Sequence, residues 1–582
     1  MASNGHRRMS VLDSDFPDFV NSVLDDYEGS DASDCEIEND PDYNSEHDTH
    51  SEQEDDYEEE VDAGYQRSSL YLYGKNGFKW CTTEPNKNRR TPAHNIVIKV
   101  PTLKGVAKDL GNTCSPIQAW GCLFTEDMIT EIVRHTNTKI SSYRSRFSDQ
   151  TRTELRDTNM TELRALFGFL YYTAIFKSNH ECLESMFATD GSGRDIFRAI
   201  FSLRRVYVLL YCLRFDDVET REERKENDPC AAISHIFQRM FENSQSCYNI
   251  CSYACIDEML VGFRGRCKFR VYMASKPEKY GVKIMILSDA KTNYLLNAYI
   301  YAGKDSDGIG LSAEEKTLQK PTQSVLRLAR PIIGSNRNIT ADNYFSSVQL
   351  VSELKERKLT YVGTLRKNKR DIPQEFQPNR KRQVGSTEYG FTDDKTIISH
   401  VPKKGKSVIL LSSMHHSKCT DPETGKPEII SFYNSTKGGV DTLDQKCMNY
   451  STNRRTRRWP LALFYSILNI IGVNSYILHS SFKDYKTISR YEFLKTLGRQ
   501  LTESYLNERL LNERLPKELR MIVSKILKKP VPKKEITNQG SKRKRCTFCP
   551  RSSEKKTNQY CVSCDRPVCQ TCRSIMCNEC GE

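Results

Sequence analysis

The hydrophobic pattern divides the chain into regions of different secondary structure. Between residues 118 and 250, stretches such as DTNMTELRALFGFLYYTAIF place apolar residues three and four positions apart. This is the spacing of side chains on one face of a helix. The pattern therefore predicts a helical domain in this region.

The segments that follow are typical of strands. They are short, rich in Val, Ile and Tyr, and separated by turn residues: YACIDEMLVGF, KYGVKIMILSDAKTNYLLNAYIYAG and RNITADNYF. The link at 291–293 predicts a hairpin. A helix (FSSVQLVSELKERK), a strand (LTYVGTLRKN), a basic segment and more strands come next. WPLALFYSILNIIGVNSYILHSSF then predicts an apolar helix with Pro at an early position, where it is tolerated.

Charge changes this picture at the N-terminus. Residues 9–66 hold 22 Asp or Glu and no Lys or Arg, which leaves residues 67–582 with 85 basic and 53 acidic residues. The acidic, Ser-rich tail predicts disorder, either as an inert solubilising tail or with a short docking motif in it. The basic body favours a polyanionic partner over a merely Lys-rich surface. We find no signal-peptide pattern and no apolar run of eighteen residues, which predicts a soluble intracellular protein.

Three aspartates stand where strands and a helix would present them to one site. Asp257 lies in a predicted strand, Asp342 just past another, and Asp441 at the mouth of a helix, with Asp444 on the same face. The order of strand, hairpin, strand, helix and strand is that of an RNase H-like fold. Two Mg²⁺ ions about 4 Å apart would suit such carboxylates. The pattern alone also fits aspartates that simply end strands and cap helices.

Eight of the 21 cysteines fall in the last 37 residues, in four C-x2-C pairs. Four pairs of thiolates suit two tetrahedral zinc sites. The short gaps favour interleaved sites over sequential ones, with Cys546, Cys549, Cys569 and Cys572 in one and Cys561, Cys564, Cys577 and Cys580 in the other. A finger of this size needs metal to fold.

Five blocks then identify a family. IDEMLVGFRGR, SKPEKYGVKI, RNITADNYFSS, YVGTLRKNKRDIP and YNSTKGGVDTLDQ stand in the order, and close to the spacings, of the piggyBac family of DNA transposases. The likeness resumes in NRRTRRWPLALFY and the terminal cysteines, and covers about residues 118–582. The chain resembles an insect-type member close to the founding one.

The resemblance implies a chemistry and a set of residues. Catalytic aspartates fall on Asp257, Asp342 and Asp441, with Asp444 also required, and they would hold two Mg²⁺ or Mn²⁺ ions. The family cuts transposon ends through hairpin intermediates, inserts at TTAA, excises without a scar, and works as a homodimer on terminal inverted repeats. Asp441 and Asp444 would hold cations, while the nearby arginines would hold the DNA.

The remaining expected DNA contacts are basic residues. Lys437 and the two glycines after it would allow close approach to a phosphate. Trp459 would stack on an unpaired base or else pack in the core. The DNA-binding set is Arg366, Lys367, Lys369, Arg370, Lys437, Arg454, Arg455, Arg457, Arg458, Trp459, Lys542, Arg543, Lys544 and Arg545. The last four also read as a nuclear localisation signal. The founding-type finger, which recognises the transposon end, has a His where this chain has Cys572.

The expected fold is α/β. It has an RNase H-like catalytic core with a β-rich insertion, a split all-α dimerisation and DNA-binding domain, and a C-terminal cross-brace zinc finger. A domesticated DNA-binding protein and a RING-like ubiquitin ligase are the competing interpretations. The expected domains are an acidic disordered region (1–117), the helical domain (118–252 and 457–528), the catalytic domain (253–367 and 431–456), the insertion (368–430), a basic linker (529–545) and the finger (546–582).

Overall fold

The computed structural model describes residues 70–85, 97, 100–111, 114–147, 149–482, 488–532, 543–553, 555–561 and 566–572. The chain forms two compact units, Met1–Leu527 and Lys528–Glu582. The candidate active site lies in the first unit, and the cysteine cluster lies in the second.

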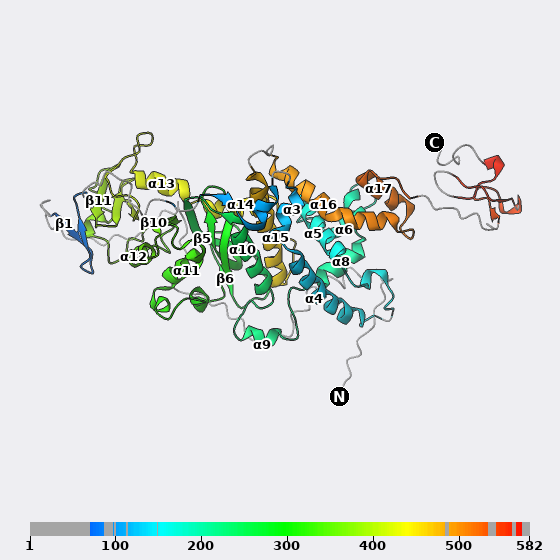
Figure 1. Cartoon of the computed structure of the whole chain (residues 1–582), viewed down its shortest axis with the longest axis horizontal. Helices are drawn as coiled ribbons and strands as arrows, with labels where there is room; N and C mark the ends of the chain where they lie inside the picture. The colour runs from blue at the N-terminus through cyan, green and yellow to red at the C-terminus, as the bar shows by residue number, and fades with distance from the viewer. Residues whose placement is uncertain are drawn as a thin grey trace, which may run out of the picture. The chain divides into compact units, whose positions relative to one another are not determined.

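One mixed sheet of eleven strands runs through the described part of the first unit (Figure 1). These strands are β1 (Tyr71–Tyr73), β2 (Lys79–Cys81), β5 (Tyr253–Gly262), β6 (Arg270–Tyr272), β7 (Tyr280–Asp289), β8 (Leu295–Ile300), β9 (Asn338–Ala341), β10 (Thr360–Thr364), β11 (Thr387–Phe391), β12 (Thr396–His400) and β13 (Val408–Ser412). Their order is β1-β2-β11-β12-β13-β10-β9-β5-β7-β6, and β8 also pairs with β7.

The middle of this sheet has the predicted RNase H-like arrangement. The order is β8-β7-β5-β9-β10, with β7 antiparallel to β5 and β8, and β9 parallel to β5 and β10. The parallel register sets Ile256 opposite Ala341, so the next residue of each chain segment, Asp257 and Asp342, emerges at the same level. The expected fold class is confirmed, and this register is what brings the first two aspartates together.

Four helices complete the core. They are α11 (Lys320–Ala329), α12 (Val348–Glu356), α13 (Glu428–Thr436) and α14 (Gly439–Asn449). Ile429, Ile430 and Tyr433 of α13 pack in a buried cluster with Val362 of β10, Ile398 of β12 and Leu410 of β13. This apolar contact fixes the segment that leads into α14, which carries Asp441 and Asp444.

The insertion is β-rich as expected, and it extends the core sheet. Strands β11, β12 and β13 form an antiparallel meander, and β13 pairs with β10. Residues 365–386 connect β10 to this meander, and the loop from Arg366 to Asp371 is the first part of that connection.

The expectation of disorder across residues 1–117 is wrong for its later part. Strands β1 and β2 form a hairpin that joins the sheet through Cys81 and Phe391. Trp80 is fully buried, and its indole nitrogen donates to the Asp371 carbonyl over 2.9 Å. Farther on, β3 (Thr102–Leu103) pairs with β4 (Tyr248–Asn249), and α2 (Gly105–Asp109) follows β3. Burial of an aromatic ring holds the hairpin in place, whereas residues 1–69 lie outside the described part.

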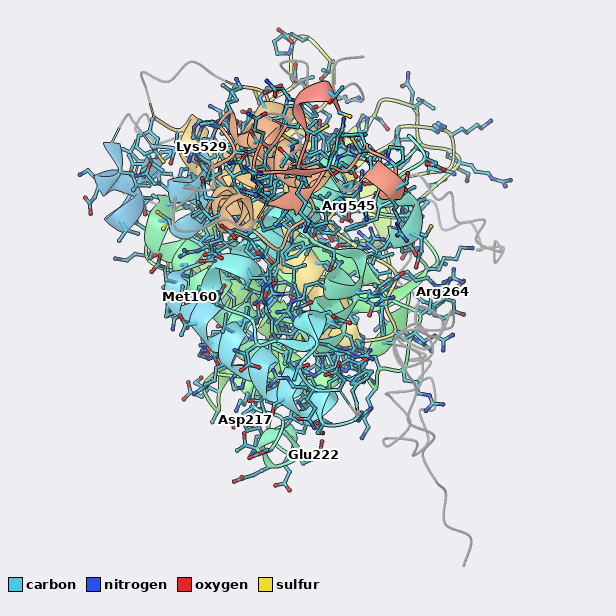
Figure 2. The ribbon with its side chains drawn as sticks, turned by 90° about the vertical axis from the view of Figure 1, so that its right-hand side faces the viewer. Met160, Asp217, Glu222, Arg264, Lys529 and Arg545 are labelled. Carbon is cyan, nitrogen blue, oxygen red and sulfur yellow. The ribbon has the colours of Figure 1, made fainter. Side chains whose placement is uncertain are left out.

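The helical domain is built from two distant parts of the chain. Its helices are α3 (Pro116–Gly121), α4 (Glu126–Arg144), α5 (Met160–Ile175), α6 (Leu183–Met186), α7 (Asp195–Ile200), α8 (Leu203–Cys212), α9 (Arg221–Lys225), α10 (Ser234–Cys247), α15 (Trp459–Ser480), α16 (Arg490–Leu511) and α17 (Lys517–Leu527). Helices α5 and α16 approach closely because Gly168 faces Gly498. Asp217, in the loop before α9, and Glu222, in α9 itself, lie at the bottom of the view in Figure 2.

Helix α15 is long and apolar enough to cross a membrane by length and composition. However, 94% of its most apolar window is buried inside the protein. Its Asn474 side chain bonds the backbone of Leu295 in β8. We therefore interpret α15 as the central helix that joins the helical domain to the sheet.

Candidate active site

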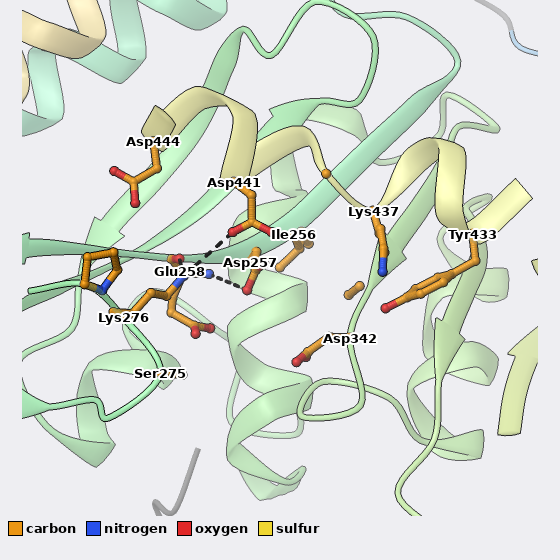
Figure 3. A pocket seen from close by; sticks show the side chains of 13 residues that line it. Ile256, Asp257, Glu258, Ser275, Lys276, Asp342, Tyr433, Lys437, Asp441 and Asp444 are labelled. Carbon is orange, nitrogen blue, oxygen red and sulfur yellow. Dashed lines mark hydrogen bonds and ion pairs between the residues drawn. The ribbon is translucent and has the colours of Figure 1, made fainter. Parts of the chain in front are cut away.

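The four predicted aspartates line one pocket. Its volume is about 310 Å³, and its walls are Ile256, Asp257, Glu258, Ser275, Lys276, Pro277, Ala341, Asp342, Tyr433, Lys437, Gly438, Asp441 and Asp444. Asp257 comes from β5, Asp342 from the end of β9, and Asp441 and Asp444 from α14. Figure 3 shows Asp257, Asp342 and Asp441 around a common space, with Asp444 one turn farther along the helix.

Local hydrogen bonds fix the two strand aspartates. The Glu258 amide donates to Asp257 Oδ1 over 2.8 Å, and the Tyr344 amide donates to Asp342 Oδ1 over 3.0 Å. Asp441 lies in the first turn of α14, where the helix dipole favours a negative charge, and its side chain is 67% exposed. The site thus combines two carboxylates held by backbone amides with one that is largely exposed.

The glycines before Asp441 have different surroundings. A Cβ added to Gly439 would lie 2.7 Å from Cys255 Cβ and 2.9 Å from Ser288 Oγ, so α14 packs directly on the sheet there. A Cβ on Gly438 would meet only Thr442 Oγ1, at 3.8 Å. The sequence argument assigned both glycines to phosphate approach, but only Gly438 lines the pocket. A glycine is needed at position 439 because any larger side chain would clash with the sheet.

The acids strongly affect one another. Burial, followed by the charges of Glu258 and Asp342, raises the pKa of Asp257 well above its usual value. Burial likewise raises the pKa of Asp444 to about 6. A divalent cation would remove this repulsion, because its charge offsets that of the clustered carboxylates.

The donor set fits hard divalent cations. All the acidic ligands are oxygen atoms, which Mg²⁺ and Mn²⁺ prefer. In the described part of the chain, only the cysteine group discussed below has at least three ligand atoms all within 4.8 Å of one another. The aspartate oxygens of the pocket are therefore farther apart than the sulfurs of that cysteine group.

Sequence reasoning missed Lys276 and Glu258. Lys276 Nζ donates to the Glu258 carbonyl over 3.1 Å and lies 3.8 Å from Asp441 Oδ1. Burial alone would lower the pKa of Lys276, but the charges of Glu258 and Asp257 outweigh it and raise that pKa. The only available signal was the position of both residues inside the blocks IDEMLVGFRGR and SKPEKYGVKI.

Comparison with known proteins decides the family. A family profile described as Transposase IS4 matches residues 115–476. A solved cryo-EM structure of a piggyBac transposase synaptic complex with hairpin DNA is 36% identical. It has a TM-score of 0.70 and covers 82% of this chain and 99% of that one. The chain belongs to the piggyBac family of transposases.

Human piggyBac relatives are more distant. PiggyBac transposable element-derived protein 3 of Homo sapiens is 23% identical over 274 residues, which are 44% of each chain. PiggyBac transposable element-derived protein 2 of Homo sapiens is 22% identical over 390 residues, 63% of this chain and 61% of the relative. The chain thus spans less than two thirds of these curated relatives.

Burial divides the predicted arginine cluster of this piggyBac family member into two groups. Arg458 is 7% exposed and donates to the carbonyls of Leu210, Tyr211 and Leu213 at the end of α8. Its assignment as a DNA contact is therefore wrong: the guanidinium satisfies helix-end carbonyls. Arg454 is also turned inward, toward the Ser178 and Glu181 carbonyls.

Arg455 and Arg457 are exposed, so they remain candidates for DNA contact. Trp459 is half-buried and meets Phe269 edge-on, with 5.0 Å between ring centroids. This contact agrees with core packing, one of the two roles expected for Trp459. The other role, stacking on an unpaired base, stays a prediction.

The other predicted basic residues lie near the pocket or outside the described part. Arg366 Nε donates to Asn343 Oδ1 over 3.3 Å, directly beside Asp342. Lys437 lines the pocket, with its ammonium 5.4 Å from the Tyr433 ring. Arg370 is exposed, whereas Lys367 and Lys369 are half-buried. Lys542 lies outside the described residues, and Arg543, Lys544 and Arg545 are exposed.

The second unit brings together four of the predicted zinc ligands. The sulfurs of Cys546, Cys549, Cys569 and Cys572 all lie within 4.8 Å of one another. Strands β14 (Lys544–Arg545) and β15 (Lys556–Thr557) pair beside them. Four thiolates in this spacing could hold one tetrahedral zinc ion. This grouping matches the interleaved arrangement for the first site. Cys561 packs against Val568, while Cys564, Cys577 and Cys580 lie outside the described residues.

Proposed function

We propose that this chain is an active cut-and-paste DNA transposase. The observation that carries the proposal is the pocket itself. Asp257, Asp342 and Asp441 come from three separate segments of an RNase H-like core, two at strands and one on helix α14, and line one acidic cavity of about 310 Å³. A DNA-binding descendant that had lost cleavage would not need these carboxylates together.

The residues of the pocket divide the work of phosphoryl transfer. Asp257, Asp342 and Asp441 would hold two Mg²⁺ or Mn²⁺ ions, which, when bound, supply charge neutralisation and an activated oxygen nucleophile. Asp444, one turn from Asp441, keeps that end of the pocket negative. The protein otherwise positions the scissile phosphate, so that water attacks first and the freed 3′-hydroxyl attacks next.

Basic residues around the pocket would hold the DNA backbone. Lys437, Arg455 and Arg457 are the residues best placed for this, together with the loop from Arg366 to Arg370. Each phosphate neutralised by a basic side chain strengthens binding in a salt-dependent way. The finger, with two zinc ions, would recognise the transposon's terminal inverted repeats.

Several finer features of the proposal follow the family. They are hairpin intermediates at the cut ends, integration at TTAA, scarless excision and action as a homodimer. The related solved structure is described as a synaptic complex with hairpin DNA, which supports the first of these features. The basic stretch 542–545 supports action in the nucleus.

The test is an excision and integration assay on a donor plasmid that carries the DNA flanking this gene. We expect wild type to excise the element and restore TTAA, and Asp342→Asn to do neither while still binding the ends. Retention of DNA binding without excision by wild type would refute the proposal in favour of a domesticated binder.

A further inference from the structure

Lys276 occupies a fixed position in the acidic pocket. Its loop joins β6 to β7 and is closed by hydrogen bonds from Met273 N to the Lys279 carbonyl and from Lys276 N to the Met273 carbonyl. Met273 is fully buried, and Pro277 restricts the backbone of the residue before it. These contacts fix the backbone on either side of Lys276.

The ammonium group of Lys276 is placed between two walls of the site. It donates to the Glu258 carbonyl on β5 over 3.1 Å and lies 3.8 Å from Asp441 Oδ1 on α14 (Figure 3). The side chain is only 16% exposed. The other lysine of the pocket, Lys437, lies beside the Tyr433 ring on the opposite wall. Lys276 is thus the lysine of this pocket that pairs with a proposed metal ligand.

This position has a consequence when cations and DNA arrive. A divalent ion bound by Asp441 would repel the nearby ammonium and replace it as the partner of the carboxylate. The scissile phosphate brings a negative charge into the same pocket, which offers the displaced ammonium a new partner. Lysine suits this exchange, since its point charge sits on a flexible stem.

We propose that Lys276 balances the charge of the pocket in two states: it pairs with Asp441 in the DNA-free protein and binds a non-bridging oxygen of the scissile phosphate in the complex. The second half rests on the proposed function, whereas the first half does not. Lys276 thereby contacts the substrate directly, whereas the aspartates hold the metal ions.

The test uses the full chain with Lys276→Met and, as a matched control, Lys279→Met, an exposed lysine of the same loop. Mn²⁺ binding to the DNA-free protein is followed by electron paramagnetic resonance. The acidic tail would also bind Mn²⁺. The Mn²⁺ signal that disappears in Asp342→Asn is therefore taken as binding in the aspartate pocket. We expect about tenfold tighter Mn²⁺ binding in Lys276→Met, from removal of the competing charge, and no change in Lys279→Met.

Single-turnover cleavage at saturating Mn²⁺ tests the second half. We expect Lys276→Met to cleave about ten- to a hundredfold more slowly than wild type with unchanged affinity for the DNA end, and Lys276→Arg to recover part of the rate. Lys276→Gln replaces Lys276→Met if the latter does not fold.

Unchanged Mn²⁺ affinity in Lys276→Met would refute the proposed pairing of Lys276 with Asp441 in the DNA-free protein. Cleavage by Lys276→Met at the wild-type rate would refute the proposed phosphate contact. If wild type itself fails to cleave DNA, the proposed function and the phosphate contact fall together, and the Mn²⁺ affinities still decide the ion pair.

Discussion

Gly439→Ala tests whether the packing of α14 on the sheet sets the geometry of the active site. The added Cβ would lie 2.7 Å from Cys255 Cβ and 2.9 Å from Ser288 Oγ. An ordinary contact begins near 3.4 Å, so the start of α14 has to move away from the sheet by about 0.7 Å. Asp441 lies two residues later and moves with it. Because a misplacement of about 1 Å costs on the order of a hundredfold in rate, we expect cleavage to fall about ten- to a hundredfold.

The assay is single-turnover cleavage of a labelled transposon end, with DNA affinity and melting temperature measured in parallel. Overpacking should destabilise the protein by about 1–3 kcal/mol, which leaves it folded. Gly438→Ala is the matched stability control, because its Cβ meets only Thr442 Oγ1 at 3.8 Å, and we expect its melting temperature to stay at the wild-type value. Wild-type cleavage by Gly439→Ala would refute the packing argument. A loss of cleavage confined to Gly438→Ala would favour the role in phosphate approach.

Four further predictions concern other parts of the molecule. Arg458→Ala should lower the free energy of unfolding by about 1–3 kcal/mol, because the Leu210 carbonyl loses its partner while Arg214 still bonds the carbonyls of Tyr211 and Leu213. Arg455→Ala should leave stability unchanged and reduce the salt slope of DNA binding by about 1; the reverse pattern would contradict both assignments. Trp80→Ala should cost about 3–5 kcal/mol locally and speed hydrogen exchange in β11–β13, and unchanged exchange there would show that the hairpin is not needed. Chelation of zinc or Cys549→Ser should unfold the finger, seen by NMR, without changing the melting of the first unit; a finger that stays folded would argue against a structural zinc site.

The part of the site that could be predicted from the sequence depends on helix periodicity and on the order of strands and helices. Asp441 and Asp444 share a helix face because they are three residues apart, and Asp257 and Asp342 meet because the parallel pairing of β5 with β9 sets Ile256 opposite Ala341. The first fact follows from spacing along the chain, and the second was expected from the order of the predicted elements. The order of strands and helices was likewise enough to predict the middle of the sheet.

The unpredicted part depends on contacts between distant segments. Arg458 looked like its neighbours in sequence, but its partners are helix-end carbonyls 245 to 248 residues away. The strands β1 and β2 have three residues each, too short for periodicity to reveal them, and are held by the burial of Trp80. Nothing in the sequence distinguishes Lys276 from the other lysines, because its contact with Asp441 exists only in the folded chain.

The most direct test of the account is cleavage of a labelled transposon end by the purified full chain, with and without Mg²⁺, comparing wild type with Asp342→Asn. The account predicts Mg²⁺-dependent nicking followed by a hairpin product in wild type, and neither in the variant, although both proteins bind the end. Cleavage by Asp342→Asn at the wild-type rate would contradict the claim that the aspartate pocket carries the chemistry.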